Sequence, residues 1–293
     1  MTIPKSASAS SSNQELRGAL YAVVATLFFA SSAAITRMAV GISAAEVAFW
    51  RMAGGALLVG ALAKINGQPL RISRAQFLRF VIYGAITAAH FWLYISSLGS
   101  TSITHSVTLV NTAPLFVTLL SAIWLREPVA PRKLIGIVLA VVGIAILMSF
   151  GAVTPQGMVG DLMAVGSALC YAIYSLAGRH ERESIPVLSY CFWVYGLAAL
   201  VLAPLSFSRP HLPYPSVTWL AVGLLALLPT AFGHTLYNAA VRHTRAIYAN
   251  LISTQEVTGG ILLGWLMWGE PLTSQSLLGA AVTVLGIVLV YWL

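Results

Sequence analysis

The stretch REPVAPRKLIGIVLAVVGI, residues 126–144, decides the fold because it recurs near the C-terminus as GEPLTSQSLLGAAVTVLGI, residues 269–287. Each copy has Glu-Pro, seven residues, a glycine, six residues and a second glycine followed by isoleucine. Further matches at an offset of 142–143 residues are Gly18 with Gly160, Ala30 with Ala172, Arg37 with Arg179, Thr87 with Thr230, Tyr94 with Tyr237 and Thr101 with Thr244. The recurrence indicates two related halves.

The composition requires lipid as the outer solvent. Of the 293 residues, 58% are hydrophobic and 8% are charged, with a mean hydropathy of +0.85. Soluble domains carry roughly 25% charged residues, and a membrane-spanning helix needs roughly 20 mostly apolar residues. The apolar runs and the turn signals between them predict spans at 16–37, 44–63, 77–98, 103–125, 132–150, 159–179, 187–206, 216–238, 246–268 and 275–293.

Each half holds five of these spans, and an odd number inserts the second copy upside down. The loop charges agree, because residues 126–133 carry three basic residues and residues 269–275 carry none. Inverted repeats are typical of secondary transporters, which bind substrate near the midplane between the halves. We therefore predict an all-α polytopic membrane protein with ten transmembrane helices in two inverted five-helix repeats, residues 16–150 and 159–293, after a disordered cytoplasmic tail of residues 1–15.

The basic residues predict the orientation. Alternate loops hold 13 of them on one side and two on the other, with Arg51 inside the second span. The larger set is Lys5, Arg17, Lys64, Arg71, Arg74, Arg79, Arg126, Arg132, Lys133, Arg179, Arg182, Arg242 and Arg245, and the smaller is Arg37 and Arg209. The positive-inside rule then places both termini in the cytoplasm. The net charge of +8 is thereby explained by orientation rather than by nucleic-acid binding.

The pattern Tyr-x6-Thr…Glu-Pro-x7-Gly-x6-Gly, present once in each half, resembles the EamA-type proteins of the drug/metabolite transporter superfamily. The resemblance covers nearly the whole chain after residue 15, and is closest to bacterial exporters of aromatic and other hydrophobic amino acids. It implies a bacterial inner-membrane protein with a central cavity lined mainly by spans 1, 3, 4, 6, 8 and 9. Spans 5 and 10 would be peripheral.

Polar residues repeat along single faces of several spans, for example at Tyr83, Thr87, His90, Tyr94 and Ser97 in span 3. Because polar groups in hydrocarbon are costly, such faces should meet a cavity or another helix. The candidate substrate-binding residues are His90, Tyr94, Asn111, Tyr171, His234, Tyr237 and Glu256. The alternative is that such groups satisfy backbone carbonyls or mark the interfacial belts.

Two charged residues inside the spans need an explanation. Arg51, with Glu46 nearby, favours a structural role, and contact with a substrate carboxylate is the alternative. Glu256 lies deep in span 9, where a low dielectric penalises its charged form. It is a candidate proton carrier, and the alternative is a neutral side chain bonded to a neighbouring helix.

These observations predict an exporter of amino acids, aromatic or hydrophobic with Thr and Met as further candidates, that works by alternating access with protons as the candidate coupling ion. The alternatives are an exporter of another metabolite or drug, an intramembrane enzyme, or a channel. The sequence contains no Gly-x4-Gly-Lys-Ser/Thr loop and no metal-spaced Cys/His cluster. We therefore expect no catalytic residues, no metal and no cofactor, with membrane lipid and small molecules as the partners.

Overall fold

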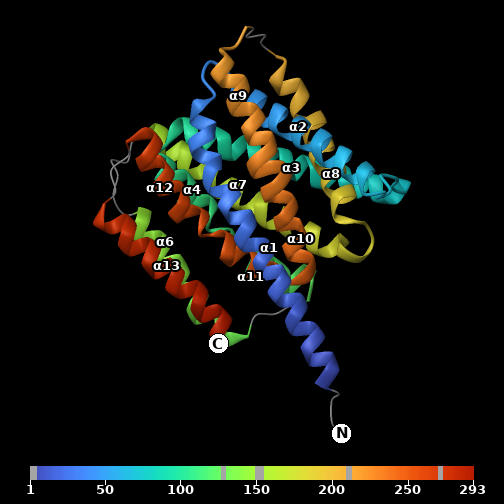
Figure 1. The fold of residues 1–293 in the computed structure, drawn as a ribbon. Coiled ribbons are helices and arrows are strands. Elements are labelled where there is room, and N and C mark those ends of the chain that lie inside the picture. Colours follow the sequence, from blue (N-terminus) through green and yellow to red (C-terminus); the bar gives the residue numbers. More distant parts are fainter. Residues whose placement is uncertain (1–4, 127–129, 149–154, 209–212, 270–272) are drawn as a thin grey trace.

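The computed structural model describes residues 5–126, 130–148, 155–208, 213–269 and 273–293, which form helices joined by turns and short loops (Figure 1). The first half consists of α1 (Lys5–Met38), α2 (Ala44–Ile65), α3 (Arg74–Ser100), α4 (Ile103–Val110), α5 (Ala113–Trp124) and α6 (Pro131–Met148). The second half consists of α7 (Pro155–His180), the short η1 (Glu181–Glu183), α8 (Val187–Ser206), α9 (Ser216–Leu225), the π-helix η2 (Ala226–His234), α10 (Thr235–His243), α11 (Ala246–Ser253), α12 (Glu256–Trp268) and α13 (Ser274–Trp292).

Seven helical segments in the described ranges are long and apolar enough to cross a membrane. They are Asn13–Met38, Ala44–Ile65, Arg74–Ser100, Ile103–Trp124, Pro155–His180, Val187–Ser206 and Ser216–His243. The other three predicted spans coincide with α6, with α11 and α12, and with α13. The helical class is confirmed, and the count of ten spans stays a prediction.

Residues 5–15 belong to the first turns of α1, which leaves the bundle at the N-terminal end (Figure 1). The assignment of residues 1–15 as a disordered cytoplasmic tail stays a prediction. Serine is only moderately unfavourable in a helix, and the apolar run that follows already supplies a helical nucleus.

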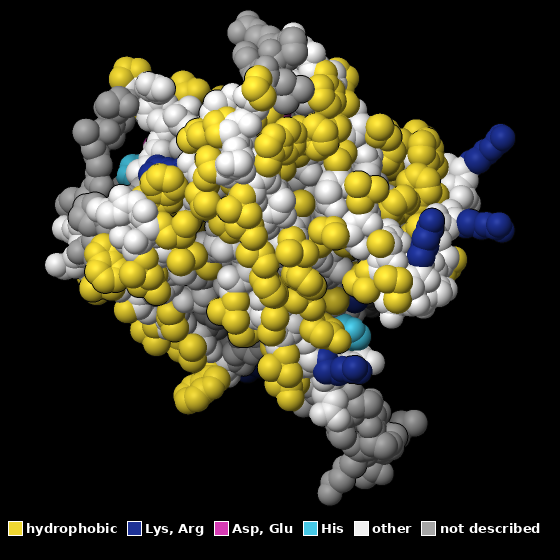
Figure 2. Space-filling model, turned by 45° about the horizontal axis from the view of Figure 1, so that its top comes forward, with side chains coloured by type: hydrophobic (Ala, Val, Ile, Leu, Met, Phe, Trp, Pro, Cys, Tyr) yellow, Lys and Arg dark blue, Asp and Glu magenta, His cyan; other side chains and the backbone are white. Residues whose placement is uncertain are grey.

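Many large hydrophobic side chains are exposed on the described part of the chain. Leu27, Leu57 and Leu162 are 71%, 73% and 71% exposed, and Figure 2 shows a face covered largely by hydrophobic side chains with few lysines and arginines. A water-soluble monomer rarely exposes apolar patches of this extent. The hydrophobic surface therefore fits lipid, as the composition requires.

The two halves pack reciprocally. Helices α2 and α8 occupy matching places in the two repeats and pack against each other, as do α6 and α13. Helix α3 packs against α7 of the other half, and α1 packs in the corresponding way against η2 and α10. Contacts of this kind are what two structurally related halves produce, and they bring interior turns of α1, α3 and α7 together with the end of η2.

The repeated glycines explain the α6–α13 pair at the edge of the bundle (Figure 1). A Cβ at Gly143 would lie 2.5 Å from the backbone nitrogen of Thr283, and a Cβ at Gly286 would lie 2.4 Å from that of Ala140. These contacts are equivalent in the two copies, so the second glycine of each motif allows the two backbones to touch. The Glu-Pro pairs, Glu127-Pro128 and Glu270-Pro271, lie outside the described residues.

Two matching helices are interrupted at matching positions. The predicted span 103–125 is broken between α4 and α5 at Asn111 and Thr112, and the span 246–268 is broken between α11 and α12 at Thr254 and Gln255. Pro114, in the first turn of α5, cannot supply a backbone N–H to the preceding turn. Discontinuous helices near the middle of the membrane build substrate sites in several transporter folds.

Candidate functional site

A small cavity of about 20 Å³ lies where the two halves meet. Its walls come from α1, α2, α3, α4, α7, η2 and α12, and the break at Asn111 and the start of α12 at Glu256 both open onto it. The lining residues are Phe29, Ser32, Arg51, His90, Phe91, Tyr94, Val110, Asn111, Tyr171, His234 and Glu256. A cavity of this volume holds about one water molecule, so the structure represents a closed state of the site.

Six of the seven predicted binding residues line this cavity, namely His90, Tyr94, Asn111, Tyr171, His234 and Glu256. The seventh, Tyr237, lies directly behind Tyr171 with ring centroids 5.2 Å apart. The spans implied by the family resemblance therefore meet as expected. Span 2 is added to them through Arg51.

The two histidines form the centre of an aromatic wall. Their ring centroids are 6.2 Å apart, and the His234 ring packs 4.5 Å from that of Phe29 and 4.9 Å from that of Phe91. Tyr171 stacks on His90 with centroids 5.1 Å apart. The wall offers flat apolar faces with polar edges, a surface that suits an amphipathic ligand.

Hydrogen bonds orient His90. The Ser167 hydroxyl donates to the His90 carbonyl at 3.0 Å, and the His90 Nδ1 lies 2.8 Å from the Ser167 Oγ and 3.1 Å from the Ser167 carbonyl. Because the hydroxyl proton is used on the carbonyl, Nδ1 carries the ring proton and donates it to Ser167. This assignment leaves Nε2 of His90 as an acceptor.

A layer of tyrosine and amide side chains closes one end of the cavity. The Tyr237 hydroxyl lies 2.5 Å from Ser175 Oγ and accepts a hydrogen bond from Asn250 at 2.7 Å. The neighbouring Asn238 donates to Tyr174 Oη. Tyr237 is fully buried in this layer, which we call the tyrosine floor, and it is not among the residues that line the cavity.

Arg51 has two hydrogen-bond partners on other helices. The residue is 1% exposed, lines the cavity and bonds to Thr230 of η2 and Ser32 of α1 rather than to Glu46. Glu46 caps α2, accepting from the backbone N–H and hydroxyl of Ser43, and it accepts a further hydrogen bond from Tyr214. The cost of an arginine inside a span was the available signal for this position, but its partner is 179 residues away.

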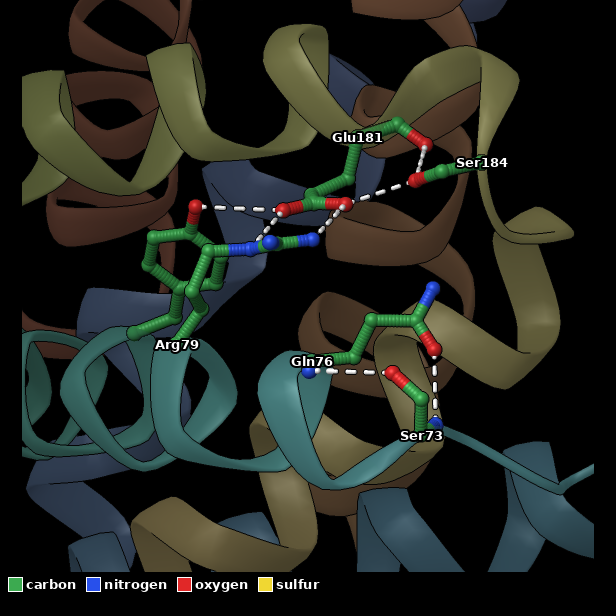
Figure 3. A network of polar contacts seen from close by, with 6 residues as sticks. Ser73, Gln76, Arg79, Glu181 and Ser184 are labelled. Atoms are coloured by element: carbon green, nitrogen blue, oxygen red, sulfur yellow. Dashed lines mark hydrogen bonds and ion pairs between the residues drawn. The ribbon is translucent and has the colours of Figure 1, made fainter.

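Beyond the floor, a polar network joins the halves at the end of the bundle that carries Lys64, Arg74 and Arg79, which we call the basic end. The Glu181 carboxylate accepts from Arg79 Nε at 2.9 Å, from Tyr83 at 3.2 Å and from Ser184 at 2.6 Å (Figure 3). Arg79 and Tyr83 lie on α3 and Glu181 on η1. The network, which we call the basic-end latch, thus fastens one half to the other.

These hydrogen bonds change the pKa of the Glu181 carboxyl. Burial by itself raises the pKa of Glu181, but the hydrogen bonds from Ser184 and Arg79 outweigh burial and hold the pKa below its usual value. The ionised form is therefore the one that the folded state stabilises.

Comparison with known proteins gives the class. The model of the EamA-like transporter family matches this chain twice, over residues 16–149 and 158–292. The chain belongs to the EamA-like transporter family. It is a multi-pass membrane transporter and not an enzyme, since the relatives in this family are named transporters and exporters.

Individual relatives span most of the chain. The pseudopaline exporter of Pseudomonas aeruginosa is 28% identical over 276 residues, which cover 91% of this chain and 93% of the exporter. The threonine/homoserine exporter of Escherichia coli K12 is 27% identical over 244 residues, covering 81% and 78%. One protein crystal structure is similar with a TM-score of 0.78 over 94% of this chain and 97% of that one, and at 18% identity it shows a shared fold.

The basic-end latch should make the stability of the protein depend on pH. Replacing Glu181 with Gln removes its ion pair, and since Arg79 is 45% exposed we expect a loss of about 1 kcal/mol at pH 7. The ionised carboxyl stabilises the fold fully above its unfolded pKa of about 4.3, and this contribution is lost as the pH falls through the lower folded value. The gap in Tm between parent and Glu181→Gln should therefore narrow at acid pH.

The measurement is thermal unfolding of the purified protein in detergent from pH 7 downwards, with Glu15→Gln, an exposed carboxyl on α1, as the control. The control should follow the parent at neutral pH. A gap that stays constant over the whole range would contradict the latch.

Proposed function

We propose that this transporter exports amino acids, aromatic and hydrophobic ones with Thr and Met as further cargo, out of the cytoplasm. The observation that carries the proposal is the central cavity, which combines aromatic walls with one cation and one carboxylate, Arg51 and Glu256. An amino acid carries opposite charges beside an apolar or amphipathic side chain and matches this combination. The threonine/homoserine exporter, a relative over four-fifths of the chain, supports the same class of cargo.

The mechanism that we propose is alternating access without ATP. The central cavity is too small for an amino acid, while wider hollows lie towards the two ends of the bundle. One, of about 600 Å³, is lined at the basic end by Gln14, Gln68, Arg179 and Arg242 among others, and another, of about 300 Å³, by Thr36, Ile42, Ile95 and Gly99 among others. Cargo would enter when the latch and the tyrosine floor part, and leave when the opposite end opens.

The orientation follows from the charge distribution. The excess of basic residues on one side supports a bacterial inner-membrane location with both termini in the cytoplasm. The basic end, with the latch and the larger hollow, would then face the cytoplasm and receive the cargo.

The coupling ion that we propose is the proton, carried by Glu256. Glu256 lines the cavity, and the charged or titratable groups facing it there are Arg51, His90, Tyr94, Tyr171 and His234. The position that matches Glu256 in the first half is Ala113, so no second carboxylate shares the role. A lone group that meets each side in turn can exchange a proton as the cavity alternates.

Export is tested first. Cells overproducing the protein should tolerate toxic analogues of aromatic amino acids better than cells without it. Tyr94→Ala removes one aromatic wall and should weaken export by about threefold to tenfold, the loss expected for one aromatic contact. Tyr248→Ala, which removes a buried tyrosine of the separate cluster around α6 and α11, serves as the matched control. Unchanged tolerance to every amino-acid analogue would make the cargo assignment wrong.

Coupling is tested with Glu256→Gln in proteoliposomes. The variant should still exchange labelled substrate, because exchange needs no net proton movement, and it should fail to concentrate substrate when a pH difference is imposed. If Glu256→Gln responds to the pH difference as the parent does, Glu256 carries no proton and the protein is a facilitator.

A further inference from the structure

We propose that Arg51 is the carboxylate-binding residue of the central cavity and that Glu256 faces it as the ammonium-binding residue, so that the site selects zwitterions. This inference rests on the proposed export of amino acids and deepens it, because it states which end of the cargo each residue binds.

The Arg51 guanidinium makes two hydrogen bonds. Its Nε donates to Thr230 Oγ1 at 2.8 Å and its Nη1 donates to Ser32 Oγ at 2.9 Å. Both partners are neutral hydroxyls, and a guanidinium has five N–H donors. Among the described residues, no hydrogen bond occupies Nη2. The cation is thus held firmly by two contacts and retains donors for a third.

The Arg51 guanidinium is held beside the cavity. Its guanidinium carbon lies 4.5 Å from the centroid of the Phe91 ring, and both side chains line the cavity. Thr230 is itself fixed, because its hydroxyl donates to the Leu225 carbonyl five residues earlier, across the π-helical turn that contains Pro229. The π-helix therefore places an acceptor where it can fix Arg51 at the edge of the cavity.

Glu256 supplies the opposite charge in the same cavity. Glu256 begins α12 and reaches the same cavity, yet no ion pair joins it to Arg51 in the described part of the chain. Two opposite charges that share a cavity without touching leave room for a ligand that touches both. A carboxylate bound to a guanidinium fork and an ammonium bound to a carboxylate are strong, charge-assisted contacts.

Two tyrosine side chains of the cavity wall can move to admit such a ligand. The hydroxyls of Tyr94 and Tyr171 have no hydrogen-bond partner among the described residues. Both rings can therefore turn away without breaking a bond, which widens the cavity beside the two charges. The side chain of the cargo would then lie against Phe29 and Phe91, with the turned ring of Tyr94 along its side.

The test is a binding assay on the purified full chain in lipid nanodiscs. The probes are tryptophan and threonine, each beside its amide, in which the carboxylate is replaced by a neutral group. The parent should bind at least one of the acids about tenfold more tightly than its amide, the discrimination expected from one charge-assisted pair. In Arg51→Gln the acid and the amide should bind within about twofold of each other.

Further variants separate a loss of carboxylate binding from a general loss of folded protein. Arg74→Gln, an exposed arginine at the start of α3 at the basic end, should keep the full discrimination. Glu256→Gln should also keep it, but should lose the preference for tryptophan over indole-3-propionate, which lacks the ammonium group. Arg51→Lys should restore part of the acid preference because it keeps the charge without the fork.

The outcomes distinguish the two proposals. A parent that binds acid and amide equally overturns the role of Arg51 and leaves amino-acid export standing, and this arm needs no variant to fold. Full discrimination in a folded Arg51→Gln overturns it as well. A parent that binds neither amino acid overturns the proposed cargo, and the zwitterion site with it.

Discussion

A polar group that faces hydrocarbon has no water to bond with, so each one in this chain must find a partner inside the protein. This constraint sorts the residues. Leucines such as Leu27 and Leu162 remain on the outside, while His90, His234 and Asn238 are turned inwards and almost fully buried. The cavity forms where this sorting gathers polar and charged groups that do not all find hydrogen-bond partners among the described residues, for example the hydroxyls of Tyr94 and Tyr171.

The backbone obeys the same constraint. The breaks at Asn111 and at Thr254–Gln255 release backbone groups from the helical ladder, and they do so beside the cavity rather than at the lipid surface. Two half-helices in matching positions give the site a structural counterpart in each repeat. Movement of one half against the other can then reshape the cavity without exposing these groups to lipid, a property that alternating access needs.

Much of this architecture could be predicted from the sequence. Long hydrophobic runs define helices in lipid because a helix satisfies its backbone hydrogen bonds within a single segment, and the repeated Glu-Pro and glycine spacing identifies two related halves. The polar faces of the spans gave five cavity residues, since a polar stripe at helical spacing has to point inwards, and the buried charge of Glu256 gave the sixth. The roles of those residues in binding stay proposals.

What the sequence could not predict depends on how one helix is set against another. Periodicity shows which face of α2 is buried and not that Arg51 meets Thr230, and it assigns Tyr237 to a polar face without showing that Ser175 and Asn250 hold it in a floor. Arg79 was counted among the residues that set orientation, whereas the structure pairs it with Glu181 of the other half. Such pairings depend on close helix contacts at small residues, for example at Gly55 of α2, where a Cβ would lie 2.6 Å from Thr230 Cγ2 of η2.

The central claim is that one closed cavity between the halves binds an amino acid and opens to each side in turn. Counterflow tests it most directly: proteoliposomes are loaded with unlabelled Trp, Phe, Met or Thr, and the entry of a trace of the same labelled amino acid is followed. For at least one of them, the label should accumulate transiently above its equilibrium level, because the unlabelled amino acid inside competes with the label for the carrier and slows the exit of the label. Entry that rises to equilibrium without an overshoot, at a rate independent of the internal amino acid, would contradict it and indicate a channel.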